Sequence, residues 1–349
     1  MELATIIQQY LPRLKARYAR RLLPGHLNAI DAMLRCRSPD AGEMLLVCAE
    51  CQEQRGYPLS CGHRSCPKCQ NHETSRWLDR QQAKLLPVDY FLVTFTLPRE
   101  LRSLAWHHQK QMYALLLTLA AKTLRDFGLN PKHLGADIGL TAVLHTHSRR
   151  LDYHPHVHVI VPGGGVNRAR KQWRKVRGKY LFNQQALARV FRARMLAAIQ
   201  VAGLNLPGKL PRKWVVDCKP VGKGQPALKY LARYLYRGVI GENNILANRD
   251  GRVTFKYLDS KTGETQYRTE KGEDFLWLVL QHVLPRGFRR VRDTGFLHGN
   301  AKKILALIQL ILRVRIATRP PRPRPPIHCP KCQSPMRIVS ILRPDWPSG

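Results

Sequence analysis

The spacing of apolar residues along the chain predicts an alternation of helices and strands. Apolar positions recur at helical spacing, between basic ones, over residues 2–35, which predicts two short helices. Further helices are predicted over 72–86, 104–128, 183–200, 226–238, 275–284 and 301–317. Strands rich in β-branched and aromatic residues are predicted over 89–98, 138–147, 153–162 and 212–220, with a hairpin over 252–259 and 265–270.

The predicted strand at 153–162 carries an unusual alternation, HPHVHVIVP, and is followed by three glycines. Residues two apart in a strand share a face, so His154, His156 and His158 lie on one side. The valines at 157, 159 and 161 lie on the other side and predict a face directed to the core. The glycines at 163–165 fit either a plain turn or a close approach of a DNA strand.

The preceding strand also contains histidines, His145 and His147. If the two strands form a hairpin around residues 148–153, His145 falls opposite His156 with side chains about 5 Å apart. Three imidazoles could then converge on one cation, with His147 as an alternative to His145. A structural zinc site on this strand is the competing interpretation.

Composition indicates a polyanionic partner. The chain has 349 residues, and its 59 Lys and Arg against 23 Asp and Glu give a net charge of +36, spread along the sequence. Each cation docked on a phosphate releases counterions, which favours nucleic acid. We find no apolar run of about 18 residues and no hydrophobic signal region, so a membrane partner and a secreted protein are not expected. We expect a cytoplasmic, nucleoid-associated protein.

The nine cysteines are clustered, which favours metal binding over disulfides. The pair Cys48 and Cys51 precedes the pair Cys66 and Cys69 by a spacer of fourteen residues, which predicts four thiolates on one structural Zn²⁺. Further potential ligands leave a second zinc or another set of four open: Cys36, Cys61, His63 and His26. Cys329 and Cys332 form half a site unless His328 or a partner element completes it.

The segment KYLARYLYR supplies candidate nucleophiles. Tyr230 and Tyr234 are four residues apart, so on a helix both phenols lie on one face, whereas Tyr236 is expected to pack. An amphipathic helix with aromatic packing is the alternative. Candidate DNA-contacting residues are Arg168, Arg170, Lys171, Trp173, Arg174, Lys175, Arg177, Arg233 and Arg237.

These segments together resemble the insertion sequence 91 family of transposases, two-tyrosine enzymes of the HUH nuclease superfamily. The matching parts are the cysteine-rich segment, FLVTFTLP, AVLHTH, YHPHVHVIVPGGG, KYLARYLYRGVI and RRVRDTGFLHGN, in family order over about residues 20–300. The resemblance implies that Tyr230 and Tyr234 are nucleophiles and that His156 and His158 bind catalytic Mg²⁺ or Mn²⁺. It also implies nicking and rejoining of single-stranded DNA at transposon ends through a 5′-phosphotyrosine, in rolling-circle-type transposition. His145 as third ligand rests on the hairpin geometry alone.

The predicted fold is α+β, an antiparallel HUH nuclease-like sheet with helices, preceded by a small zinc-binding domain. The expected parts are 1–86 with N-terminal helices and zinc, 87–242 with the catalytic residues, 243–318 completing the transposase domain, and 319–349 as a basic proline-rich tail with CPKC. No small-molecule substrate is expected, and the oligomeric state is left open. The alternatives are a non-catalytic zinc-dependent nucleic-acid-binding protein and a plasmid replication initiator or relaxase.

Overall fold

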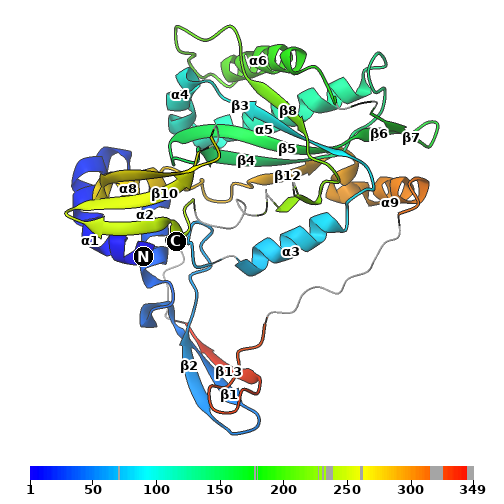
Figure 1. Cartoon of the computed structure of the whole chain (residues 1–349). Coiled ribbons are helices and arrows are strands. Elements are labelled where there is room, and N and C mark those ends of the chain that lie inside the picture. The colour runs from blue at the N-terminus through cyan, green and yellow to red at the C-terminus, as the bar shows by residue number, and fades with distance from the viewer. Residues whose placement is uncertain are drawn as a thin grey trace.

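A five-stranded antiparallel sheet forms the centre of the molecule (Figure 1). The computed structural model describes residues 1–69, 71–176, 178, 180–226, 228–229, 232, 239–259, 262–314 and 325–343. The strand order is β12-β4-β5-β3-β8, with bounds Tyr90–Thr96 for β3, Leu140–His147 for β4, Tyr153–Pro162 for β5, Val216–Pro220 for β8 and Val291–Thr294 for β12. β5 lies in the middle and pairs with β4 on one side and β3 on the other. The predicted α+β class and antiparallel sheet are confirmed.

One face of this sheet is apolar and is covered by two long helices, α5 (Gln109–Leu129) and α6 (Gln184–Val201) (Figure 1). Val157, Val159 and Val161 are fully buried there, as the alternation predicted. Burying each valine contributes about 1.5–3 kcal/mol to stability. The predicted helix 104–128 is divided at His108 into α4 (Arg102–His107) and α5, because the backbone at His108 leaves helical angles.

The opposite face carries the histidines and a second hydrophobic cluster. α3 (Asn71–Gln82) and α9 (Lys302–Ile311) lie on this side, where Trp77 and Ile308 join Val143 and Ile160 in that cluster (Figure 1). A hairpin of β6 (Gly164–Asn167) and β7 (Gln172–Lys175) extends from the end of β5. Because of the alternation in β5, its valines face α5 and α6, and its histidines lie on the opposite face of the sheet.

The three glycines after β5 are explained by close packing. A Cβ on Gly164 would stand 2.5 Å from the Trp173 ring, and a Cβ on Gly165 would stand 2.6 Å from the backbone oxygen of Asp137. Asp137 pairs with Val166 as an isolated bridge. The neighbouring strand and loop therefore occupy the space beside Gly164 and Gly165, so packing within the protein explains why these two positions are glycine.

The N-terminal helices pack on elements from much later in the chain. α1 (Leu3–Tyr18) and α2 (Pro24–Arg35) share a core with α8 (Gly272–Leu280) and with the sheet of β9 (Ile245–Arg249), β10 (Arg252–Leu258) and β11 (Thr265–Lys271). The predicted hairpin over 252–270 is confirmed as β10 and β11. The first residue of α8 is glycine because a Cβ on Gly272 would stand 2.4 Å from the Tyr10 ring.

A third, smaller sheet joins segments from the two halves of the sequence. Its order is β13-β1-β2, with β1 at Glu43–Cys48, β2 at Gln54–Pro58 and β13 at Met336–Leu342. In Figure 1 the red β13 lies beside the blue β1. Short 3₁₀ turns occur at Ala19–Arg21, Pro39–Ala41, Arg99–Leu101, Glu242–Asn244, Gly295–Leu297 and Gly299–Ala301. Within the described ranges, no helix combines the length and apolar character needed to cross a membrane.

Candidate metal centres and a basic cavity

Three histidines converge on the face of the central sheet that lies opposite α5 and α6. β4 and β5 pair so that His145 stands opposite His156, as the hairpin spacing predicted. Ring nitrogens of His145, His156 and His158 all lie within 4.8 Å of one another. The ring centroids of His145 and His158 are 4.5 Å apart, and those of His156 and His158 are 4.8 Å apart. The cluster is built from two adjacent strands and is therefore held rigidly by the sheet.

Hydrogen bonds orient two of these rings. The Nδ1–H of His156 donates to the backbone oxygen of His154 at 2.6 Å, so the lone pair of His156 is on Nε2. Nδ1 of His158 lies 2.9 Å from Oγ1 of Thr94 on β3, and the hydroxyl can accept from a protonated Nδ1 in the same way. Partners of this kind fix the tautomer and direction of metal-binding imidazoles.

Burial keeps the three imidazoles neutral. It lowers the pKa of His156 to about 4 and that of His158 to about 3. The pKa of His145 also lies well below its ordinary value, first because of burial and then because of the neighbouring His158 and His156. Since neutral imidazole is the form that coordinates a cation, the set fits a divalent metal.

The other histidines of these strands lie outside the cluster. The ring of His147 stacks near that of His145 at 6.1 Å and lies 5.2 Å from that of His282. Nδ1 of His154 contacts the guanidinium of Arg102. Of the two candidates for third ligand, the geometry therefore favours His145.

The tyrosine segment falls mostly outside the described residues. Tyr230 and Tyr234 lie outside them, as do the candidate DNA contacts Arg177, Arg233 and Arg237. Among the described neighbours in the sequence, Leu228 and Ala232 are buried at 3% and 4% exposure in the same cluster as Val143 and Ile160. In the register of the sheet, Val143 stands opposite His158. The chain on either side of position 230 is thus anchored on the histidine face.

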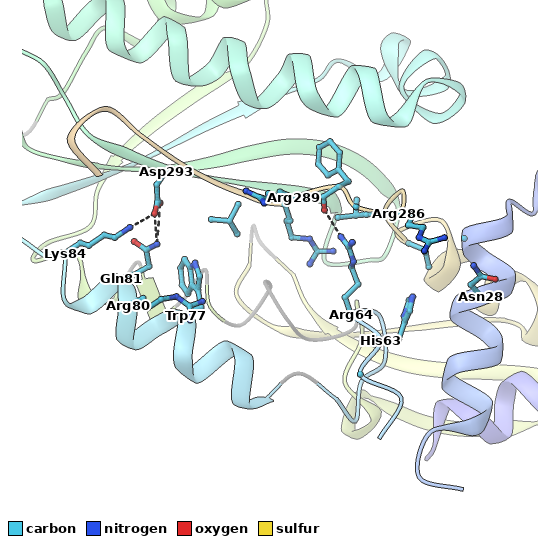
Figure 2. Close-up of a pocket in the computed structure, with 18 of the residues that line it drawn as sticks. Asn28, His63, Arg64, Trp77, Arg80, Gln81, Lys84, Arg286, Arg289 and Asp293 are labelled. Carbon is cyan, nitrogen blue, oxygen red and sulfur yellow. Dashed lines mark hydrogen bonds and ion pairs between the residues drawn. The ribbon is translucent and has the colours of Figure 1, made fainter. Parts of the chain in front are cut away.

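A basic cavity of about 1210 Å³ lies between α3, the loop at 62–64 and the segment 283–293 (Figure 2). Six cationic side chains line it: Arg64, Arg80, Lys84, Arg286, Arg289 and Arg290. Its carboxylate, Asp293, is already paired, because it lies 2.6 Å from the Lys84 ammonium and accepts hydrogen bonds from Gln81 and Thr141. The cavity therefore presents a strongly positive surface.

This cavity adjoins the histidine cluster through the sheet. Val291 lines the cavity and pairs with Val143, which in turn pairs with His158. The backbone oxygen of Arg290 accepts a hydrogen bond from Leu144 at 2.9 Å. Sequence reasoning did not single out this cavity, because its cations come from three separated segments. The run RGFRRVRD at 286–293 was the available signal.

The predicted DNA-contacting hairpin divides into structural and exposed residues. Trp173 packs against Phe296, with ring centroids 5.9 Å apart, and Arg174 donates to the backbone oxygens of Leu134 and Gly135. Arg168 pairs with Asp137 at 2.7 Å. Arg170, Lys171 and Lys175 are exposed. Trp173 is thus partly buried against Phe296, while the three exposed cations are accessible to phosphates, and contact of these residues with DNA stays a prediction.

One cysteine cluster lies in the N-terminal core. Its thiols are those of Cys36, at the end of α2, and of Cys61, Cys66 and Cys69, in the loop before α3. The Sγ atoms of Cys36 and Cys69 are 3.5 Å apart, and those of Cys61 and Cys69 are 3.6 Å apart. Four thiols at such distances match a tetrahedral structural zinc site.

A second cluster combines the first cysteine pair with the last. Cys48 and Cys51 stand beside Cys329 and Cys332, and the four sulfurs lie within 4.8 Å of one another. The expected grouping of Cys48, Cys51, Cys66 and Cys69 around one ion is therefore corrected. The spacing along the sequence predicted the wrong set of ligands because each of the two pairs lies closer in the fold to other cysteines.

His63 and His26 belong to neither cluster. His63 lines the basic cavity. His26 is buried, with its ring centroid 5.7 Å from that of Trp106 and 5.9 Å from that of Trp277.

Comparisons with known protein sequences agree on one class. Residues 139–304 match a family model described as "Putative transposase", and residues 6–97 match one described as "Transposase zinc-binding domain". "Putative transposase y4qJ" from Sinorhizobium fredii is 34% identical over 331 residues, which cover 88% of this chain and 83% of that protein. "Transposase for insertion sequence element IS801" from Pseudomonas savastanoi pv. phaseolicola is 28% identical, over 78% of this chain and 70% of that protein.

Among solved structures, "Conjugative Relaxase TrwC in complex with OriT Dna" aligns with 65% of this chain and 73% of its own, at 15% identity and a TM-score of 0.28. The sequence matches define a transposase with a zinc-binding N-terminal domain. The chain belongs to the insertion sequence 91 family of transposases, which confirms the resemblance drawn from its motifs.

Proposed function

We propose that this transposase nicks and rejoins single-stranded DNA at transposon ends through a 5′-phosphotyrosine intermediate, in rolling-circle-type transposition. The observation that carries the proposal is the cluster of His145, His156 and His158 on one rigid sheet face. Three neutral, buried imidazoles fit a divalent cation, Mg²⁺ or Mn²⁺. When bound, such an ion withdraws charge from a phosphate oxygen and aligns the phosphate for in-line attack.

Tyr230 and Tyr234 are the proposed nucleophiles. A phenol oxygen forms a bond to phosphorus, the bond from phosphorus to the 3′ oxygen breaks, and the strand leaves with a free 3′-OH. The second tyrosine repeats this step at the other cleavage, and a 3′-OH attacks the phosphotyrosine to rejoin the strand. The burial of Leu228 and Ala232 in one cluster with Val143 supports this assignment, because it anchors the segment beside His158.

The substrate strand is proposed to follow the positive surface beside the histidines. The cavity with Arg64, Arg286 and Arg289 supplies fixed cations, and the exposed Arg170, Lys171 and Lys175 extend the positive charge to the hairpin. Contacts of this kind bind phosphates without reading bases. They would place the nucleoprotein complex at the nucleoid.

A covalent adduct tests the proposal. The protein is incubated with Mn²⁺ and a single-stranded oligonucleotide that carries the element's end, and is then run on a denaturing gel. We expect an adduct, which disappears when Tyr230→Phe and Tyr234→Phe are combined and persists in the control Tyr267→Phe, an exposed tyrosine on β11. His156→Ala should abolish the adduct but keep oligonucleotide binding within about twofold.

An adduct that survives in the double phenylalanine variant would reject the nucleophile assignment. No adduct from the unaltered protein, with oligonucleotide binding intact, would favour the non-catalytic zinc-dependent binder instead. Nicking without rejoining of a second end would favour a replication initiator or relaxase.

A further inference from the structure

We propose that Cys48, Cys51, Cys329 and Cys332 bind a second Zn²⁺, which fastens the C-terminal segment 325–343 to the N-terminal domain. The Sγ atoms of Cys48 and Cys332 are 3.4 Å apart, and that of Cys51 is 3.5 Å from those of Cys329 and Cys332. Zinc–sulfur bonds of about 2.3 Å in a tetrahedron place sulfurs about 3.8 Å apart. The four thiols are thus already assembled at close to the spacing that zinc requires.

The two cysteine pairs have the same local geometry. Each is Cys-x-x-Cys followed by a glutamine with positive φ, Gln52 at 55° and Gln333 at 63°. In each, the first cysteine donates its backbone N–H to the residue five positions later: Cys48 to Glu53 at 2.9 Å and Cys329 to Ser334 at 2.8 Å. Two equivalent turns facing one another are the arrangement of a zinc ribbon.

The sheet around the four cysteines also connects the C-terminal segment to the N-terminal domain. β13 pairs with β1 from Glu43 opposite Leu342 to Cys48 opposite Met336 (Figure 1). An ion pair crosses between the two turns, since the Lys331 ammonium lies 2.6 Å from a carboxylate oxygen of Glu53. The C-terminal segment is therefore a structural part of the N-terminal sheet.

This sheet has a small hydrophobic core. Its buried cluster consists of Leu46, Cys48, Cys329 and Met336. Small domains of this kind obtain their folding energy from the metal. The proposed site joins residues 284 positions apart in the sequence, and cross-links that close long loops give the largest entropic stabilisation.

Metal analysis of the full chain tests the stoichiometry. We expect two zinc ions per purified chain, and one when Cys329→Ser and Cys332→Ser are combined. The control Cys218→Ser, a cysteine outside both clusters, should keep two. The single change Cys332→His, which keeps a metal ligand at this position, should keep the second zinc.

A second measurement reports the fastening itself. A specific protease site is inserted within residues 315–324 of the full chain, which carries a tag at its N-terminus. After cleavage, the C-terminal fragment should stay with the tagged part when Cys329 and Cys332 are present, and should separate in the double serine variant. Neither measurement depends on DNA cleavage.

One zinc in the unaltered chain, or an equal zinc content in the unaltered chain and the double serine variant, would overturn the proposed site. Retention of the cleaved fragment in the double serine variant, to the same extent as with the cysteines, would overturn the fastening role.

Discussion

Replacing Thr94 by valine should weaken metal binding without unfolding the sheet. Oγ1 of Thr94 lies 2.9 Å from Nδ1 of His158, on the side of the ring away from Nε2. Valine has nearly the same shape, so packing on β3 is preserved while the hydrogen bond is lost. A lost hydrogen bond of this kind costs about 1–1.5 kcal/mol, and about 1.4 kcal/mol corresponds to a tenfold change in an equilibrium constant.

We therefore expect Mn²⁺ affinity to fall about tenfold, at the lower end of the 10–100-fold effects of such partners. Titration of the protein with Mn²⁺, followed by the EPR signal of the unbound ion, measures this. The matched control is Thr96→Val, on the same strand and the same face, which should change the affinity by less than twofold. Equal Mn²⁺ affinities of the two variants would refute the role of Thr94. Circular dichroism of both variants checks that a lower affinity of Thr94→Val does not come from loss of folding.

Two further predictions concern stability and the DNA contacts. Burial lowers the pKa of His26 to about 4, so the unfolded chain binds a proton there between pH 6.5 and 4 that the folded chain does not. This contribution to stability is complete above pH 6.5 and is lost as pH falls, by about 2 kcal/mol at pH 5. Urea unfolding should show that the free energy of unfolding falls less between pH 7 and pH 5 in His26→Gln than in the unaltered protein. An equal fall in both proteins would exclude this assignment. Trp173→Ala should lower the free energy of unfolding by about 3 kcal/mol because the ring packs on Phe296. Lys171→Ala, at an exposed position, should leave the free energy of unfolding unchanged and lower the salt dependence of DNA binding by about one counterion. Unchanged stability of Trp173→Ala together with weaker DNA binding would instead support base stacking by Trp173.

Local patterns predicted much of the central sheet. The alternation in 153–162 sets which side chains face the core, and the short connection at 148–153 fixes the register that places His145 opposite His156. Both depend on neighbours within about 20 residues. The helices α1, α2, α5 and α6 are predicted in the same way from their apolar spacing.

Contacts between distant segments were not predictable from spacing. The cysteine at 36 joins 61, 66 and 69 only because α2 ends beside the loop before α3. Likewise, the contact of Trp173 with Phe296, which lies more than 100 residues later in the sequence, was not predictable from the basic segment around Trp173. The basic cavity is of the same kind, since α3 and the segment 283–293 each supply part of its lining.

The arrangement of the central sheet explains how the buried histidine cluster is held in place. Val157 and Val159 hold β5 against α5 and α6, so the strand cannot shift without exposing them. Because the side-chain period is two, the same register fixes His156 and His158 on the other face. A shift of the β5 register by one residue would remove the valines from the core and the histidines from the cluster. The hydrophobic energy of one face therefore positions the imidazoles of the other, and hydrogen bonds of His158 with Thr94 and of His156 to the backbone oxygen of His154 help to orient the rings.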